Sequence, residues 1–149
     1  MKTVIISGYS CIFDDDTNTS ELYVHVTQSG YKSVRYGHGK YAGKVFSRIV
    51  LNVPDNLIAE HKSGNSLDCR KDNLRLATKA QNLYNTNGNR NKRSGLPKGV
   101  YMNRDSFIVK ISVHSTQYHL GTFNTVEEAI AAHKKAADKL HGDFAVHNR

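Results

Sequence analysis

The first 45 residues show the alternation of apolar and polar positions that is typical of short β-strands. Residues 23–26 and 31–36 are rich in Tyr and Val, and the turn formers Ser29 and Gly30 separate them. Aromatic and β-branched residues in short runs between turn formers favour strands. The aspartates at 14–16 stand beside Thr and Asn, so we expect a solvated loop there, although three adjacent carboxylates could also bind a metal.

The middle of the chain has the pattern of helix, strand, loop, strand and helix. Residues 45–51 form an apolar patch that ends before Pro54, which predicts a short helix. Residues 57–61 and 74–77 predict two strands, and the polar, Gly- and Asn-rich residues 63–72 predict a loop between them. Thr78 is a suitable N-cap for a helix over residues 80–84. We therefore expect a hairpin with a helix packed across it.

The composition changes sharply after residue 84. Residues 85–99 have almost no apolar side chains, which predicts a basic linker that could follow phosphates or simply be solvated. Beyond it, residues 99–102, 107–111 and 119–123 predict three strands. Thr125 and Glu128 form a capping box for a helix that runs to Leu140 and stops at Gly142. We predict an α+β chain with a first domain at 1–86, a flexible linker at 87–97, and a three-stranded antiparallel sheet packed on one helix at 98–149.

The balance of charge points to a polyanionic partner. The 149 residues include 21 Lys and Arg against 13 Asp and Glu, which gives a formal net charge of +8. The two cysteines, Cys11 and Cys69, form no CxxC pair, so we expect two free thiols and no structural zinc. No run approaches the roughly 18 apolar residues that cross a bilayer. We expect a soluble, cytoplasmic protein without a membrane partner.

Four polar residues in the predicted hairpin and helix could form a metal site. Glu60 offers a carboxylate oxygen and Asn82 an amide oxygen, and both suit a hard cation such as Mg²⁺. His61, neutral near pH 7, could take a proton from water, and Asn73 could hold its ring in one orientation. One such base and one cation suffice for phosphodiester hydrolysis. Taken singly, a histidine beside a glutamate is usually a surface pair, and an asparagine before a strand is usually a turn former.

This stretch resembles the HNH endonucleases of phages and mobile introns. The residues in register with the family pattern are Gly64, Asp68, Arg70, Asn73-Leu74-Arg75, Ala77-Thr78, Gln81-Asn82 and Asn85. The resemblance implies a ββα-metal fold with His61 as general base and Asn73 as its orienter. Glu60 and Asn82 are then the ligands of one divalent cation, Mg²⁺ or, as an alternative, Mn²⁺. We also assign Arg70 and Arg75 to DNA contacts.

Three positions depart from the family pattern. They are Glu60 in place of an aspartate, Cys69 in place of an asparagine and Ser47 in place of a histidine. The extra methylene of Glu60 keeps the charge but moves the oxygen by roughly 1 Å, enough to lower the rate by ~10²-fold if nothing else adjusts. None of the three departures removes the base, so an active nuclease is favoured over a degenerate relative that only binds DNA.

Residues 93–149 resemble the plant ethylene-response-type (APETALA-type) DNA-binding domain. The resemblance rests on residues 99–101, the alternating strand 107–111, residues 119–123, 127–129, 136–137 and 140–142, and Asn148. It implies that the sheet lies in the major groove of duplex DNA and reads it with its outer face. The predicted DNA contacts are Lys98, Tyr101, Asn103, Arg104, Lys110, Ser112 and Tyr118 on this face, and Arg90, Lys92 and Arg93 in the linker. The alternative is that these residues form only the solvated face of a small sheet.

The sequence thus predicts a metal-dependent DNA endonuclease, homing-endonuclease-like, that leaves a 5′-phosphate and a 3′-hydroxyl. It would act on double-stranded DNA as a monomer or homodimer, and a monomer would nick one strand. A phage gene product working in the cytoplasm of a bacterial host is the expected setting. The alternative is a catalytically degenerate DNA-binding or regulatory protein that retains both folds.

Overall fold

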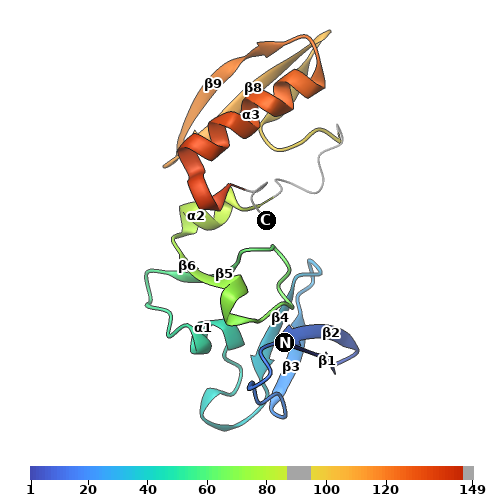
Figure 1. The fold of residues 1–149 in the computed structure, drawn as a ribbon, viewed down its shortest axis with the longest axis vertical. Helices are drawn as coiled ribbons and strands as arrows, with labels where there is room; N and C mark the ends of the chain where they lie inside the picture. Colours follow the sequence, from blue (N-terminus) through green and yellow to red (C-terminus); the bar gives the residue numbers. More distant parts are fainter. Residues whose placement is uncertain (87–94, 146–149) are drawn as a thin grey trace. The chain divides into compact units, whose positions relative to one another are not determined.

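The chain divides into two compact units, Met1–Lys79 and Ala80–Arg149. The structure, a computed structural model, describes residues 1–86 and 95–145 (Figure 1). It is a mixed α+β protein with small sheets and few helices. The division falls at residues 79 and 80, before the end of the predicted first domain at residue 86. Most of the predicted linker, with Arg90, Lys92 and Arg93, lies outside the described residues.

Two β-hairpins build the N-terminal part of the first unit. Strand β1 (Lys2–Ile6) pairs antiparallel with β2 (Tyr9–Phe13), and β3 (Leu22–Val26) pairs antiparallel with β4 (Lys32–Tyr36). The two-residue turn between β1 and β2 has positive φ at both Ser7 and Gly8, the conformation that suits the twist of a tight hairpin. The strands predicted at 23–26 and 31–36 are confirmed.

An apolar core joins these hairpins to the rest of the first unit. The short helix α1 (Phe46–Val50) confirms the helix predicted at 45–51, and a 3₁₀ turn, η1 (Gly39–Tyr41), precedes it. Phe46 packs edge-on against Phe13, with ring centroids 5.5 Å apart. Both cysteines are buried free thiols of this core, as predicted, and burial raises the pKa of Cys69 to about 12. Neither thiol is therefore a thiolate at neutral pH.

The predicted hairpin in the middle of the chain is present. Strand β5 (Ile58–His61) pairs antiparallel with β6 (Leu74–Ala77), and a 3₁₀ turn, η2 (Lys71–Asn73), leads directly into β6. The helix α2 (Lys79–Tyr84) follows β6, where the sequence predicted it. All of α2 beyond Lys79 belongs to the second unit. The packing of a helix across this hairpin therefore stays a prediction.

The second unit contains the predicted three-stranded antiparallel sheet, in the order β7 (Val100–Asn103), β8 (Ser106–Val113) and β9 (Thr116–Phe123). Helix α3 (Val126–His141) lies across it, and a 3₁₀ turn, η3 (Gly142–Phe144), follows (Figure 1). The capping box is confirmed, because Thr125 Oγ1 accepts from Glu128 N at 3.2 Å and Glu128 Oε2 accepts from Thr125 N at 3.4 Å. The small Ala129 and Ala137 are fully buried and let α3 approach the sheet closely.

Within the described part of the chain, no helix is both long enough and apolar enough to span a membrane.

Candidate functional site

Glu60 and His61 are the last two residues of β5, so their side chains point to opposite faces of the hairpin. Glu60 stands opposite Arg75 on β6, and Arg75 Nε donates to Glu60 Oε2 at 2.5 Å. The carboxylate is buried, with 3% of the residue exposed. Its second oxygen, Oε1, is also buried and has no hydrogen-bond partner among the described residues. One oxygen of Glu60 therefore carries an ion pair and the other is open to a further ligand.

His61 is half-buried at the end of the same strand. Burial lowers its pKa below the ordinary histidine value, and the negative charge of Asp68 partly opposes this by raising it. A lowered pKa keeps the imidazole neutral at pH 7, which is the protonation state of a general base. The environment of His61 thus suits the role that the sequence assigned to it.

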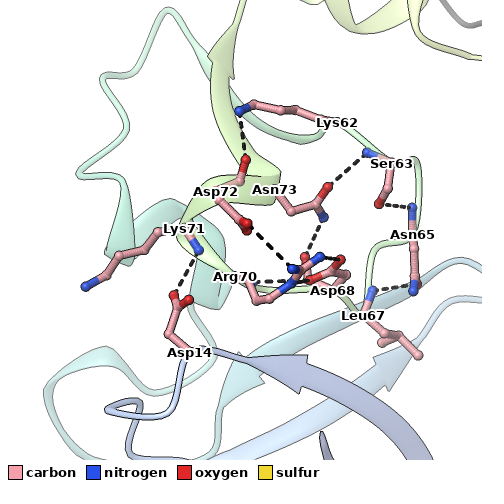
Figure 2. A network of polar contacts seen from close by, with 10 residues as sticks. All are labelled: Asp14, Lys62, Ser63, Asn65, Leu67, Asp68, Arg70, Lys71, Asp72 and Asn73. Carbon is pink, nitrogen blue, oxygen red and sulfur yellow. Dashed lines mark hydrogen bonds and ion pairs between the residues drawn. The ribbon is translucent and has the colours of Figure 1, made fainter. Parts of the chain in front are cut away.

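Asn73 fixes the loop that follows His61 (Figure 2). Its Oδ1 accepts from Ser63 N at 3.0 Å and its Nδ2 donates to the backbone oxygen of Asp68 at 2.7 Å. Its own backbone oxygen accepts from Lys62 N at 2.8 Å. These three bonds tie both ends of the loop 62–72 together. They support His61 through the backbone of the residues next to it, and the role of Asn73 as its orienter stays a prediction.

Asp68 is a residue of this site to which the sequence reasoning gave no role. It is buried, and it forms a two-bonded ion pair with Arg70, from Nε to Oδ1 at 2.8 Å and from Nη2 to Oδ2 at 2.7 Å. The hydrogen bonds from Arg70 hold the pKa of Asp68 below its usual value, so the carboxylate stays charged near His61. The D-x-R spacing of Asp68 and Arg70, in register with the HNH pattern, could have indicated this role, because it allows a bidentate ion pair between the two side chains.

The two arginines assigned to DNA contacts in the first unit are both engaged within the protein. Arg70 binds Asp68 and also lies 3.5 Å from Asp72 Oδ2, and Arg75 binds Glu60. Only 28% of the Arg70 side chain and 16% of the Arg75 side chain are exposed. In this arrangement both guanidinium groups neutralise site carboxylates. Their contact with DNA stays a prediction.

Asn82 lies on α2, which is held by residues of the second unit. The Tyr84 ring stacks on His141 with centroids 3.9 Å apart, and Tyr84 Oη accepts from His114 N at 3.0 Å. The Lys98 ammonium donates to the backbone oxygens of Leu83, Tyr84 and Thr86 at the end of the helix. Because Asn82 belongs to that unit, its convergence with Glu60 and His61 on one ion stays a prediction.

The donor atoms of the first unit can be compared with the needs of a hard cation. No three His, Cys, Asp or Glu residues of the described chain gather into a group that could hold a metal. The predicted ligand set is different, since it needs one carboxylate oxygen, one amide oxygen and oxygens from water and phosphate. The buried and unpartnered Glu60 Oε1 fits the first of these requirements. The residues present are therefore compatible with one divalent ion.

The residues predicted to read DNA in the second unit do not all share one face. Tyr101, Asn103, Lys110 and Ser112 lie on the face opposite to the buried Val109 and Ile111, and Lys110 Nζ lies 6.0 Å from the centre of the Tyr101 ring. Tyr118 is paired with Ile111, so it lies on the side that α3 covers. Arg104 is in the turn between β7 and β8. Lys98 precedes β7 and binds α2, as described above.

Comparison with known proteins supports the assignment of the middle of the chain. Residues 52–84 match the sequence profile of the HNH endonuclease family. The chain is 29% identical over 128 residues to a protein of Acanthamoeba polyphaga mimivirus named "Uncharacterized HNH endonuclease L560". The alignment covers 84% of this chain and 66% of the relative, so the chain spans just under two thirds of that protein. No solved structure matches.

Both matches are to HNH endonucleases. The family match ends at residue 84 and does not reach the three-stranded sheet. The APETALA-type resemblance of the second unit therefore stays a prediction. The relative comes from a giant virus, whereas the sequence pattern suggested a phage.

Proposed function

We propose that this protein is a divalent-metal-dependent endonuclease that hydrolyses phosphodiester bonds in duplex DNA. The observation that carries the proposal is the environment of Glu60 and His61, the last two residues of β5, which lie within the matched HNH stretch. His61 has a lowered pKa, and Glu60 presents a buried oxygen without a partner among the described residues. A neutral base and a carboxylate oxygen that can bind a cation are two groups that metal-assisted hydrolysis needs.

In the proposed reaction, His61 accepts a proton from a water molecule as the water oxygen bonds to phosphorus. The bond between phosphorus and the 3′ oxygen breaks, which leaves a 5′-phosphate and, after protonation from solvent, a 3′-hydroxyl. The Asp68 carboxylate stabilises the imidazolium that forms. Glu60 and Asn82 would hold a divalent cation, Mg²⁺ or Mn²⁺, and such a cation would supply positive charge for the departing 3′ oxygen.

The second unit is the proposed anchor on duplex DNA. The outer face of its sheet carries Tyr101, Asn103, Lys110 and Ser112, and Arg104 follows in the adjacent turn. Residues 80–149 include ten Lys and Arg against five Asp and Glu. An amide, a hydroxyl, an aromatic ring and two cations on an exposed sheet suit contacts with phosphates and base edges. As a monomer with one site the protein would nick one strand, and a homodimer could cut both.

A plasmid assay tests this proposal. Supercoiled DNA is incubated with the full chain in Mg²⁺, in Mn²⁺ and in EDTA, beside His61→Ala and a control, His25→Ala, at an exposed site on β3. We expect nicking by the wild type and by His25→Ala that needs the metal. Loss of the base should lower the rate by roughly 10²–10⁴-fold. Metal-independent nicking, or equal rates for the two variants, would contradict the proposed mechanism.

The second candidate function is DNA binding without catalysis. The ion pair between Glu60 and Arg75 favours it, because a guanidinium already bonds the carboxylate that would bind the metal. Cys69 and Ser47, where the family pattern has asparagine and histidine, point the same way. Retained binding to a DNA duplex with no nicking in either metal would establish this function. The cytoplasm of an infected cell is the proposed place of action under both functions.

A further inference from the structure

The N-terminal hairpin β1–β2 is bonded to the loop of the nuclease site. Ile12 N donates to the backbone oxygen of Leu67 at 2.9 Å, and Cys69 N donates to the backbone oxygen of Ile12 at 2.8 Å. These two bonds make a parallel bridge between Ile12 and Asp68. Residues 67–69 therefore run beside β2 like a short extra strand. The buried Cys11, Phe13 and Cys69 pack in one core beneath it.

Asp14 continues this contact from the end of β2. Its Oδ2 accepts from Lys71 N at 2.9 Å, although the two residues are 57 positions apart in the chain (Figure 2). Lys71 is the first residue of η2, and the residue before it, Arg70, makes no side-chain cap bond. A carboxylate at the first N–H of a helical turn satisfies a donor that has no partner within the turn. Asp14 thus caps η2 from a distant part of the sequence.

The turn that Asp14 caps ends at Asn73, which bonds Lys62, Ser63 and Asp68. Ser63 is two residues beyond His61, and Asp68 is the carboxylate whose charge acts on the His61 ring. A continuous series of bonds therefore runs from Asp14 through η2 and Asn73 to the residues on both sides of His61. The neighbouring Asp15 differs, because it bonds the N-terminal ammonium at an exposed position.

We propose that Asp14 is a positioning residue for the nuclease site, and that the hairpin β1–β2 is a functional part of the nuclease. Asp14 sets the position of η2 and Asn73, and through them the backbone on either side of His61. This inference rests on the proposed nuclease function. It gives the first of the three adjacent aspartates a role different from both sequence alternatives, a solvated loop and a metal cluster.

The test compares Asp14→Ala with Asp15→Ala, a matched loss of the adjacent carboxylate, and with Asp14→Asn, which keeps an oxygen acceptor. Plasmid nicking by the full chain gives kcat and KM, and hydrogen exchange by mass spectrometry follows residues 62–73. A displacement of about 1 Å at a catalytic group can lower rates by ~10²-fold. For Asp14→Ala we expect a kcat lower by roughly ten-fold, an unchanged KM for DNA, and faster exchange in 62–73.

Asp14→Asn should recover most of the rate, and Asp15→Ala should behave as the wild type. Equal kcat and equal exchange for Asp14→Ala and Asp15→Ala would overturn the inference. So would a lower melting temperature for Asp14→Ala with a normal kcat below that temperature, because this is the result of a purely structural role. If the wild type fails to nick, the proposed function fails. The exchange comparison then decides separately whether Asp14 fixes the loop.

Discussion

Glu60 stands where the HNH pattern has an aspartate, and the structure shows what its longer side chain reaches. Oε2 bonds Arg75 across the strand pair, while Oε1 remains buried without a described partner. Both residues are largely buried, so each neutralises a charge that water cannot reach. The replacement of aspartate by glutamate therefore comes with a local counter-charge. This places the departure from the family pattern in a structural context that the sequence did not reveal.

Replacement of Arg75 by methionine tests this pair. Arg75→Met leaves the buried Glu60 carboxylate without its cation, and we expect the free energy of unfolding to fall by about 3 kcal/mol. The double variant Glu60→Gln with Arg75→Met removes both charges and should be less destabilised than the single variant. Urea unfolding monitored by circular dichroism measures both. A cost below about 1 kcal/mol for Arg75→Met would show that the pair contributes no more than a surface ion pair.

The lowered pKa of His61 predicts how the nicking rate depends on pH. A general base works when it is deprotonated, so the nicking rate rises with pH through the His61 pKa. Because burial lowers that pKa below 6.5, the acidic limb of the pH–rate profile should lie below pH 6.5. Asp68→Asn removes the charge that raises the pKa and should move the limb to still lower pH. Rates at several pH values, with the ring titration of His61 by NMR, check this order, and a limb above 6.5 would contradict it.

At the scale of elements, the residue before β7 shows how closely α3 packs on the sheet. Gly99 has φ of +78°, and a Cβ there would lie 2.3 Å from the His133 ring and 2.5 Å from the backbone oxygen of Lys110. Gly99 also accepts a backbone bond from Lys110 N at 2.8 Å. A glycine at this position is required both by the backbone conformation and by the space.

Gly99→Ala should therefore destabilise the second unit by about 3 kcal/mol, from left-handed strain and overpacking together. Gly95→Ala is the control, because Gly95 also has a positive φ, +64°, but nothing lies within 4 Å of its Cβ position. The control should lose only about 1 kcal/mol. Hydrogen exchange of the β8 amides reports the stability of this unit. Equal losses for the two variants would show that the contact with His133 relaxes without cost.

The Lys98 ammonium makes α2 depend on the start of β7. It bonds the backbone oxygens of Leu83, Tyr84 and Thr86, and cations at the C-terminal end of a helix are favourable. Lys98→Met should speed hydrogen exchange in residues 80–86 by roughly five-fold or more, equivalent to about 1 kcal/mol. Lys134→Met, at an exposed site on α3, should leave it unchanged. The same exchange rate in both variants would mean that the stack of Tyr84 on His141 is enough to hold the helix.

The elements were predictable because their signals are local, whereas the contacts between them were not. The Thr125 and Glu128 capping box, the individual strands β5 and β6 and the helix at 45–51 are each encoded within a few adjacent residues. The bond from Lys71 to Asp14 crosses 57 positions, so no local pattern contains it. Tyr118 was predicted on the outer face of the sheet, but it pairs with Ile111 on the opposite face. The cause is the register shift between Val109 and Lys110, because a shift of one residue moves the side chains of a strand to the other face of the sheet.

In the candidate site, too, the residue types were predictable from local sequence and their contacts were not. The types and spacing of Glu60, His61 and Asn73 were legible in the sequence, and all three lie within residues 52–84, which match the HNH endonuclease family. The partners that set their chemistry were not, because Arg75 and Asp68 could equally have faced solvent or DNA. Burial and pairing emerge only when the strands and the loop are in place.

At the scale of the whole molecule, the positive charge is unevenly divided. Residues 1–79 include eleven Lys and Arg against eight Asp and Glu, and residues 80–149 include ten against five. In the first unit Arg70 and Arg75 are already paired with buried carboxylates. By composition the net positive charge is therefore larger in the second unit, +5 against +3 in the first. This difference supports the proposed anchoring on DNA by the second unit.

The salt dependence of DNA binding tests that division. About four phosphate contacts would weaken binding roughly 10²-fold between 50 and 200 mM salt. Arg104→Ala and Lys110→Ala should each reduce the slope of log K against log salt by about one, since each removes one phosphate contact. Lys134→Ala, which removes an exposed cation from α3, should keep the wild-type slope. Fluorescence anisotropy on a 20–30-bp duplex measures this. Equal slopes in all four proteins would place the DNA-binding surface elsewhere, and the outer face of the sheet would then be only a solvated one.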